Sequence, residues 1–199
     1  MPGQGTCAQP AWASFHAGLA LTLLALVLLA GMPRPAQAAA PTEAIQVQVE
    51  AAYLYKFASY VEWPASLFAS PRDPIVVGIF NAAPLAAELR SLTRSKSLNG
   101  RNFVVRRIDP GDNVDGVHIL FVGAADAGAA ATALESVRDR PVLTVSDSPE
   151  AFANGSMINF VVSDERLRFD VAMRPMRRSG LRLSALMLTA ANRVDRDGP

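Results

Sequence analysis

Few residues of the chain have side chains suited to chemistry, and the only histidine outside the first forty residues is His118. It lies in the apolar segment GVHILFVG, so we interpret it as a buried, hydrogen-bonded core residue and not as a catalytic base. Nucleophilic catalysis needs an accessible base beside the nucleophile, and zinc sites need several His or Cys ligands. The sequence therefore predicts a protein that is not an enzyme and that has no metal site and no cofactor.

Two further patterns that are typical of active sites are too weak to support a function. The segment GAADAG (123–128) has the glycine spacing of a phosphate-binding loop, but Ala-Ala follows it where Lys and Ser or Thr are needed. Two pairs of carboxylates lie in turn sequences, where solvated turn residues explain them: Asp112, Asp115, Asp164 and Glu165.

A small ligand could still bind at the carboxyl ends of parallel strands, which is the usual ligand position in open α/β sheets. We expect these ends to carry Asn81, Gly123, Ser146 and Asp147. Ser148 comes next and is suited to cap a short helix that begins at Pro149. Capping and ligand binding are compatible roles at this place.

The elements that would position these residues alternate along the chain. Apolar runs between turn residues predict buried strands, and the uninterrupted segments between them predict helices. This order predicts an α/β fold, a mainly parallel sheet flanked by helices, with a C-terminal antiparallel hairpin and a terminal helix. The predicted strands are 75–80, 102–108, 117–123 and 141–146, the hairpin is 157–173, and the helices are 42 to about 62, 84–93, 129–139 and 179–194.

The N-terminal segment predicts export. The apolar run AGLALTLLALVLLAG (17–31) precedes Ala36-Gln37-Ala38, an A-x-A cleavage site. A run of about fifteen residues is shorter than the roughly twenty that span a bilayer, which favours a cleaved signal peptide, residues 1–38, over a retained anchor. Residues 1–16 lack Lys and Arg, which is untypical of a signal peptide. We expect residues 39–199 to form one domain in the periplasm.

Cleavage would leave a neutral domain without cysteine. Arg34 is the only charged residue of the predicted leader, so one of the 19 Lys and Arg is lost and 18 basic residues face 18 acidic ones. Nucleic acid is therefore a poor candidate partner. The single cysteine, Cys7, lies in the leader, which excludes a disulfide and thiol chemistry in the exported domain.

Four segments together resemble the YfiR/HmsC-like family of periplasmic proteins: AAYLYKFASYVEWP (51–64), IVVGIFN (75–81), SPEAFANGSMINFVVSDERLRFDVAM (148–173) and SGLRLSALMLTAA (179–191). The resemblance covers nearly the whole chain after the leader. It implies an exported regulator, often dimeric, that binds the periplasmic part of an inner-membrane diguanylate cyclase. Such a regulator restrains cyclic-di-GMP production, and with it biofilm formation. Some relatives carry cysteine pairs for redox regulation, which this chain lacks outside the leader.

The aromatic helix carries a candidate docking stripe of Tyr53, Lys56 and Tyr60. Protein interfaces favour aromatic side chains with a polar tip, so this stripe suits a receptor or a second copy of the chain. The alternative is that the tyrosine rings pack in the core and only their hydroxyls are wet. A separate stripe is assigned to the core on its helical period: Val47, Leu54, Phe57 and Val61.

The hairpin supplies a second candidate surface. Strand alternation predicts that Arg166, Arg168 and Asp170 face outward, and the segment 166–196 contains eight arginines and two acids. This basic face is either simply solvated or meets anionic lipid or an acidic receptor surface. We expect Met176 to be an apolar point on its rim.

Two functions follow. The first is a non-enzymatic periplasmic regulator that contacts its membrane partner through Tyr53, Lys56, Tyr60, Arg168, Asp170 and Met176. The alternative is a periplasmic module that binds a small molecule at Asn81, Gly123, Ser146 and Asp147 and feeds a sensor kinase or transporter.

Overall fold

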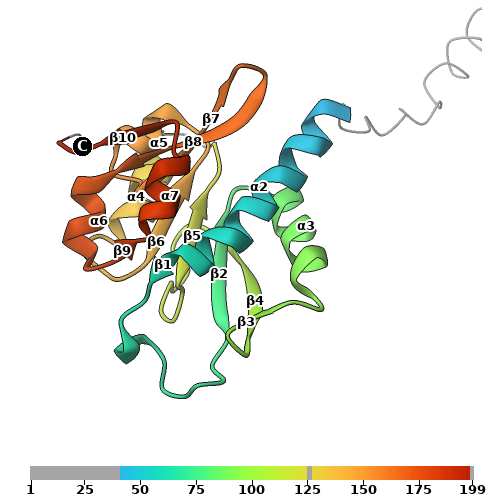
Figure 1. Cartoon of the computed structure of the whole chain (residues 1–199), viewed down its shortest axis with the longest axis vertical. Helices are drawn as coiled ribbons and strands as arrows, with labels where there is room; N and C mark the ends of the chain where they lie inside the picture. The colour runs from blue at the N-terminus through green and yellow to red at the C-terminus, as the bar shows by residue number, and fades with distance from the viewer. Residues whose placement is uncertain (1–40, 125–126, 198–199) are drawn as a thin grey trace, which may run out of the picture. The chain divides into compact units, whose positions relative to one another are not determined.

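Short apolar runs of the sequence form the strands of a central sheet (Figure 1). The computed structural model describes residues 41–124 and 127–197. Within these residues eight strands form one sheet in the order β10-β8-β7-β6-β5-β2-β4-β3. The strands of this sheet are β2 (Ile75–Phe80), β3 (Ser97–Leu98), β4 (Arg101–Ile108), β5 (Ile119–Val122), β6 (Leu143–Ser146), β7 (Ile158–Ser163), β8 (Arg166–Ala172) and β10 (Arg193–Asp195).

Most of the sheet is parallel, which confirms the predicted fold class. Strands β4, β2, β5, β6 and β7 are parallel neighbours, whereas β7 and β8 form the predicted antiparallel hairpin with Phe160 opposite Phe169. Its two-residue turn places Asp164 and Glu165 at positive φ, 52° and 59°, as a type I′ hairpin turn requires.

Helices cover both faces of the sheet. On the first, the α2 face, lie α2 (Pro41–Tyr60), α3 (Ala83–Thr93) and α7 (Ala185–Ala190); on the second, the α4 face, lie α4 (Ala127–Glu135) and α5 (Pro149–Ala153). The period of two along β2 directs Ile75, Val77 and Ile79 to the α2 face and Phe80 to the α4 face. Two hydrophobic cores result, one on each side of the sheet.

The first helix packs by the predicted stripe, because Leu54, Phe57 and Val61 are all buried. The helix predicted to reach about residue 62 ends slightly earlier, at Tyr60. Residues Val61–Glu62 form β1 and pair antiparallel with β9 (Arg182–Leu183). The backbone pairing of Val61–Glu62 with β9, a segment distant in sequence, thus ends the helix before Pro64. A 3₁₀ turn, η1 (Ala65–Leu67), follows.

The predicted terminal helix is present, but it is only six residues long, α7, and does not extend over 179–194. The hairpin leads into a short helix, α6 (Met173–Ser179), which ends at Gly180 with φ 75°. Ser184 then caps the six-residue α7 by accepting a hydrogen bond from the Met187 N–H at 3.3 Å. The chain ends as β10, which pairs in parallel with β8. Without β10, β8 would be an edge strand with unpaired backbone N–H and C=O groups. A strand can pair with these groups, whereas a helix could not.

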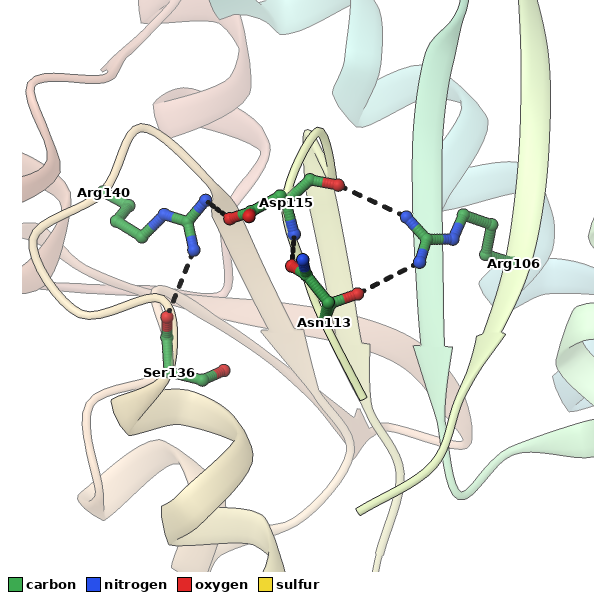
Figure 2. A network of polar contacts seen from close by, with 5 residues as sticks. All are labelled: Arg106, Asn113, Asp115, Ser136 and Arg140. Carbon is green, nitrogen blue, oxygen red and sulfur yellow. Dashed lines mark hydrogen bonds and ion pairs between the residues drawn. The ribbon is translucent and has the colours of Figure 1, made fainter. Parts of the chain in front are cut away.

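A loop, and not a helix, connects β4 to β5. Figure 2 shows how polar contacts hold it. The Arg106 guanidinium donates to the carbonyl oxygens of Asn113 at 3.0 Å and Asp115 at 3.3 Å. The Asp115 carboxylate accepts from Arg140 at 2.8 Å, and Arg140 hydrogen bonding is the main cause that lowers the Asp115 pKa. Asp115 is therefore an ion-paired loop residue.

Candidate functional site

Tyr53 lies mostly in the core. Its ring centroid is 5.6 Å from that of Phe57, 5.7 Å from Phe160 and 5.6 Å from Phe169. Its hydroxyl donates to the Leu167 carbonyl oxygen of β8 at 3.4 Å. The aromatic ring therefore joins α2 to the hairpin, which agrees with the core interpretation of this residue.

The structure does not bring Tyr53, Lys56 and Tyr60 together as one exposed face. Lys56 is exposed, whereas Tyr60 is half-buried against the core at the end of α2. The Tyr60 carbonyl oxygen accepts from the Ser184 N–H at 2.9 Å. Of the predicted stripe, Lys56 is the residue whose side chain is free to meet a partner.

Asp170 faces away from the α2 face, as alternation predicts, but it is buried and not solvent-facing. Its carboxylate accepts from Asn192 at 2.8 Å and pairs with Arg193 at 3.1 Å. The predicted outward exposure is wrong because β10, which the sequence pattern assigned to a helix, lies beside it. Arg168 on the same strand is half-buried.

The expectation for Met176 is wrong as well. Met176 is 1% exposed and belongs to the core cluster on the α2 face. The segment around it forms α6, and this helix turns the methionine inward while Arg174, Arg177 and Arg178 stay exposed. The arginines of this region are thus on the surface, but Met176, the predicted apolar point, is not.

Asn81 and Gly123 close the crevice between the ends of β2 and β5. The strand order β4-β2-β5-β6-β7 places the topological switch point here, where doubly wound sheets bind ligands. The Asn81 side-chain amide donates to the Ala124 carbonyl oxygen. A Cβ on Gly123 would lie 2.6 Å from the Asn81 carbonyl oxygen. Gly123 therefore permits close packing of these two backbone segments.

Ser146 is fully buried in a polar pair. Its hydroxyl donates to the Asn159 side-chain oxygen at 2.8 Å, across the β6–β7 register that places the two residues opposite each other. Ser148 caps α5, since it accepts from the Ala151 N–H at 3.1 Å. Both serines have structural partners.

Two carboxylates whose charges interact are withdrawn from solvent: Glu50, which is buried, and Asp147, which is half-buried. Glu50 was not among the predicted site residues. Burial raises the pKa of Asp147, and its Oδ1 has no hydrogen-bond partner among the described residues. Burial also raises the pKa of Glu50 on α2, and the charge of Asp147 adds to that rise. Glu50 accepts from Gln46 at 2.9 Å. Helical spacing was the sequence signal that could have identified Glu50 as buried, because Glu50 falls within the core stripe of Val47 and Leu54.

A cavity of 530 Å³ opens beside Asn81, at the carboxyl ends of β2 and β4. Apolar side chains and the start of α3 form most of its wall, with Arg107 and Asp109 as charged residues. Of the four predicted ligand residues only Asn81 lines it. Gly123, Ser146 and Asp147 do not.

His118 is buried and hydrogen-bonded, as predicted. Its Nδ1 accepts from the Val76 N–H at 3.1 Å, and its ring stacks on Phe68 with centroids 4.7 Å apart. Burial is the main cause that lowers its pKa, and the nearby Arg101 charge adds to it. These contacts describe a histidine held in place by the fold.

Three large apolar side chains at one end of the molecule are exposed: Ile45 by 61%, Val49 by 37% and Val162 by 68%. Ile45 and Val49 precede Tyr53 at intervals of four on α2, so they extend the side of the helix that meets the hairpin. Val162 lies opposite Leu167 and on the same strand face as Phe160, toward α2. Figure 1 shows the start of α2 and the hairpin tip projecting at this end. We call Ile45, Val49, Val162 and Leu167 the hairpin end; the sequence analysis missed it.

No group of three or more His, Cys, Asp or Glu in the described part of the chain could hold a metal ion. Among the helices of residues 41–124 and 127–197, none is long and apolar enough to cross a membrane. The predicted leader, residues 1–38, lies outside the described residues and stays a prediction.

The family model described as YfiR/HmsC-like matches residues 47–192. This range begins in α2, ends after α7 and includes both cores and the hairpin. The chain belongs to the YfiR/HmsC-like family, as its four sequence segments indicated.

Proposed function

We propose that the protein is a non-catalytic regulator in the periplasm. It binds the periplasmic part of an inner-membrane diguanylate cyclase and restrains cyclic-di-GMP production and biofilm formation. The observation that carries this proposal is the family match over residues 47–192, because regulation of this kind is what the family implies. The buried, hydrogen-bonded state of His118 is consistent with a protein that acts by binding.

The hairpin end is the surface that we propose for the membrane partner. Large exposed apolar side chains are candidate protein interaction points, and here they belong to two projecting segments, the start of α2 and the hairpin tip, which the Tyr53 hydrogen bond to Leu167 joins. None of the predicted docking residues belongs to the hairpin end: Lys56 is exposed further along α2, Tyr60 is half-buried at the far end of this helix, and Arg168 is half-buried on the face of β8 that points away from α2. Asp170 and Met176 are buried and therefore drop out of the proposed contact set.

The test is a pull-down from solubilised inner membranes with a tagged protein that lacks residues 1–38. The variant Val162→Glu should lose the cyclase and raise cyclic-di-GMP in the cell, because a charge then enters an apolar contact. Leu186→Glu on α7 is the matched control, since Leu186 is 63% exposed and Val162 68%. If wild-type protein captures no cyclase, the proposed function is wrong. If both variants capture it equally, only the proposed surface is wrong.

The 530 Å³ cavity favours one second candidate, a periplasmic module that binds a small molecule and feeds a sensor kinase or transporter. Its volume falls in the range of small-molecule sites, roughly 300–1,000 Å³. Native mass spectrometry of protein purified from the periplasm should then show a co-purifying molecule. Ala83→Phe, at an exposed position on the cavity wall, should abolish it. The same spectra report whether the protein is a dimer.

A further inference from the structure

Strand β4 has an open edge. Its partner on the outer side, β3, pairs only through Ser97 with Asn102 and Leu98 with Arg101. Strand β4 continues to Ile108, and β3 does not follow it. The backbone of residues 103–108 therefore ends the sheet on this side among the described residues.

The backbone groups that face outward along this edge can be assigned. The two-residue turn Asn99-Gly100, at φ 52° and 78°, makes Leu98 and Arg101 the hydrogen-bonded pair of the β3–β4 hairpin, so the Arg101 backbone points to β3. Alternation then directs the N–H and C=O groups of Phe103, Val105 and Arg107 the same way. The Arg90 Nε–H donates to the Val105 carbonyl oxygen at 3.3 Å, which is consistent with this assignment.

A basic hollow lies along the edge on the α2 face. It has a volume of 290 Å³, and its lining comes from α3 and β4: Arg90, Thr93, Arg94, Asn102, Phe103 and Val105. Both Arg90 and Arg94 are exposed, and neither pairs with a carboxylate within the described residues. Glu88, the acid of α3, is two residues from Arg90 and so projects from another side of the helix.

The other face of the edge is different. Arg106 points to the α4 face and is held by the β4–β5 loop (Figure 2). Arg107 alternates to the α2 face, where it pairs with Asp109 at 2.9 Å. Val104, also on the α4 face opposite Val76, is 42% exposed. A strand added to this edge would therefore meet positive charge on one face and an apolar side chain on the other.

We propose that β4 binds an extended segment of another protein in which acidic and apolar residues alternate. The segment adds a ninth strand to the sheet through the outward groups of Phe103, Val105 and Arg107, and Arg90 gives up its 3.3 Å hydrogen bond to the Val105 carbonyl oxygen when the strand pairs. Strand addition of this kind takes affinity from main-chain hydrogen bonds and specificity from the pockets for alternate side chains. The acidic side chains enter the hollow beside Arg90 and Arg94, and the apolar ones cover Val104.

Charge argues against a second copy of the chain at this edge. An antiparallel β4–β4 pair would place the α3 helices of both copies on the same face, with Arg90 and Arg94 of each copy at one groove. Like charges that face each other across strands are destabilising. The arginines that disfavour self-association thus favour an acidic strand, whether or not the hairpin end binds a membrane protein.

The test uses synthetic peptides of about eight residues, a usual strand length. The probe alternates Glu and Val, one control has the same composition with the Glu residues in one block, and the other alternates Lys and Val. Calorimetry with the protein lacking residues 1–38 should detect binding of the alternating Glu-Val peptide and of neither control peptide. Binding should slow amide hydrogen exchange at Phe103 and Arg107.

Two variants separate the contributions. Arg90→Glu with Arg94→Glu should weaken binding at least about tenfold, since two attractions become repulsions, whereas Arg138→Glu on the far side of the sheet should not. Val105→Pro should abolish binding, because it removes an outward N–H that the added strand needs. Val105 also packs against the core on the α2 face, so Val105→Ala, which loses the side chain but keeps the N–H, is the matched control and should still bind. Any of three results would overturn the proposal. The peptide with its Glu residues in one block binds as well as the alternating one, binding survives Val105→Pro with unchanged amide exchange, or no peptide binds at all. Sedimentation that shows a dimer lost in Val105→Pro would assign the edge to a second copy instead.

Discussion

Replacing Tyr53 with alanine tests whether α2 is fastened to the sheet as the structure indicates. The change deletes a ring that lies within 5.7 Å of three phenylalanine rings. Removing a buried aromatic side chain costs about 3–5 kcal/mol, and because Tyr53 is half-buried we expect the lower end, about 3 kcal/mol. For a domain of this size, 1 kcal/mol shifts the melting temperature by roughly 2–4 °C, so the expected drop is about 6–12 °C.

Two matched variants locate this loss in the ring. Tyr53→Phe removes only the 3.4 Å hydrogen bond to Leu167 and should cost less than about 1 kcal/mol. Lys56→Ala, on the exposed side of the same helix, should stay within about 0.5 kcal/mol of wild type. Urea unfolding followed by Trp63 fluorescence measures all three. A Tyr53→Ala protein as stable as wild type would refute the packing of α2 against the hairpin and return Tyr53 to the candidate docking surface.

Three further predictions concern other parts of the chain. Because burial raises the Glu50 pKa above its ordinary 4.5, the folded state holds this proton more tightly than the unfolded state, so stability falls as pH rises from about 4.5 through the raised pKa. Glu50→Gln should remove that part of the slope and stabilise the protein at about pH 7, as urea unfolding at several pH values would show. Gly123→Ala should cost about 1–3 kcal/mol, because its Cβ would lie 2.6 Å from a backbone oxygen; Gly78→Ala, which meets only side-chain carbons, should cost less in the same thermal melts. N-terminal sequencing of the periplasmic protein should begin near Ala39, and a full-length product held in membranes would contradict cleavage.

The central strands β2, β4, β5 and β6 and the β7–β8 hairpin were readable from sequence because each depends on local information, whereas the short strands β1, β3, β9 and β10 were not predicted. A run such as IVVGIF, between turn residues, can bury both of its faces only inside a sheet, and β2 has these bounds. The core stripe of α2 follows from the helical period alone, so Leu54 and Phe57 were correctly assigned. The hairpin turn at Asp164-Glu165 follows from polar residues between two alternating apolar runs.

The candidate site was less predictable, because exposure depends on segments that are distant in sequence. Asp170 lies on the outward side of its strand, yet Asn192, 22 residues later and directly before β10, donates to its carboxylate. Tyr53 has the spacing of a docking residue, but Phe160 and Phe169, more than a hundred residues away, enclose its ring. No periodicity within α2 or β8 contains that information.

The sequence by itself determined the fold class, the family and the local elements, since propensity, hydrophobic period and turn chemistry act over a few residues. Only the tertiary structure decided which polar and aromatic side chains are free. It buried Met176 in α6, closed the Asn81–Gly123 crevice, and left the hairpin end and the β4 edge open. The physical reason is that a surface is defined by what does not pack on it, and packing is settled by long-range strand pairing and helix docking.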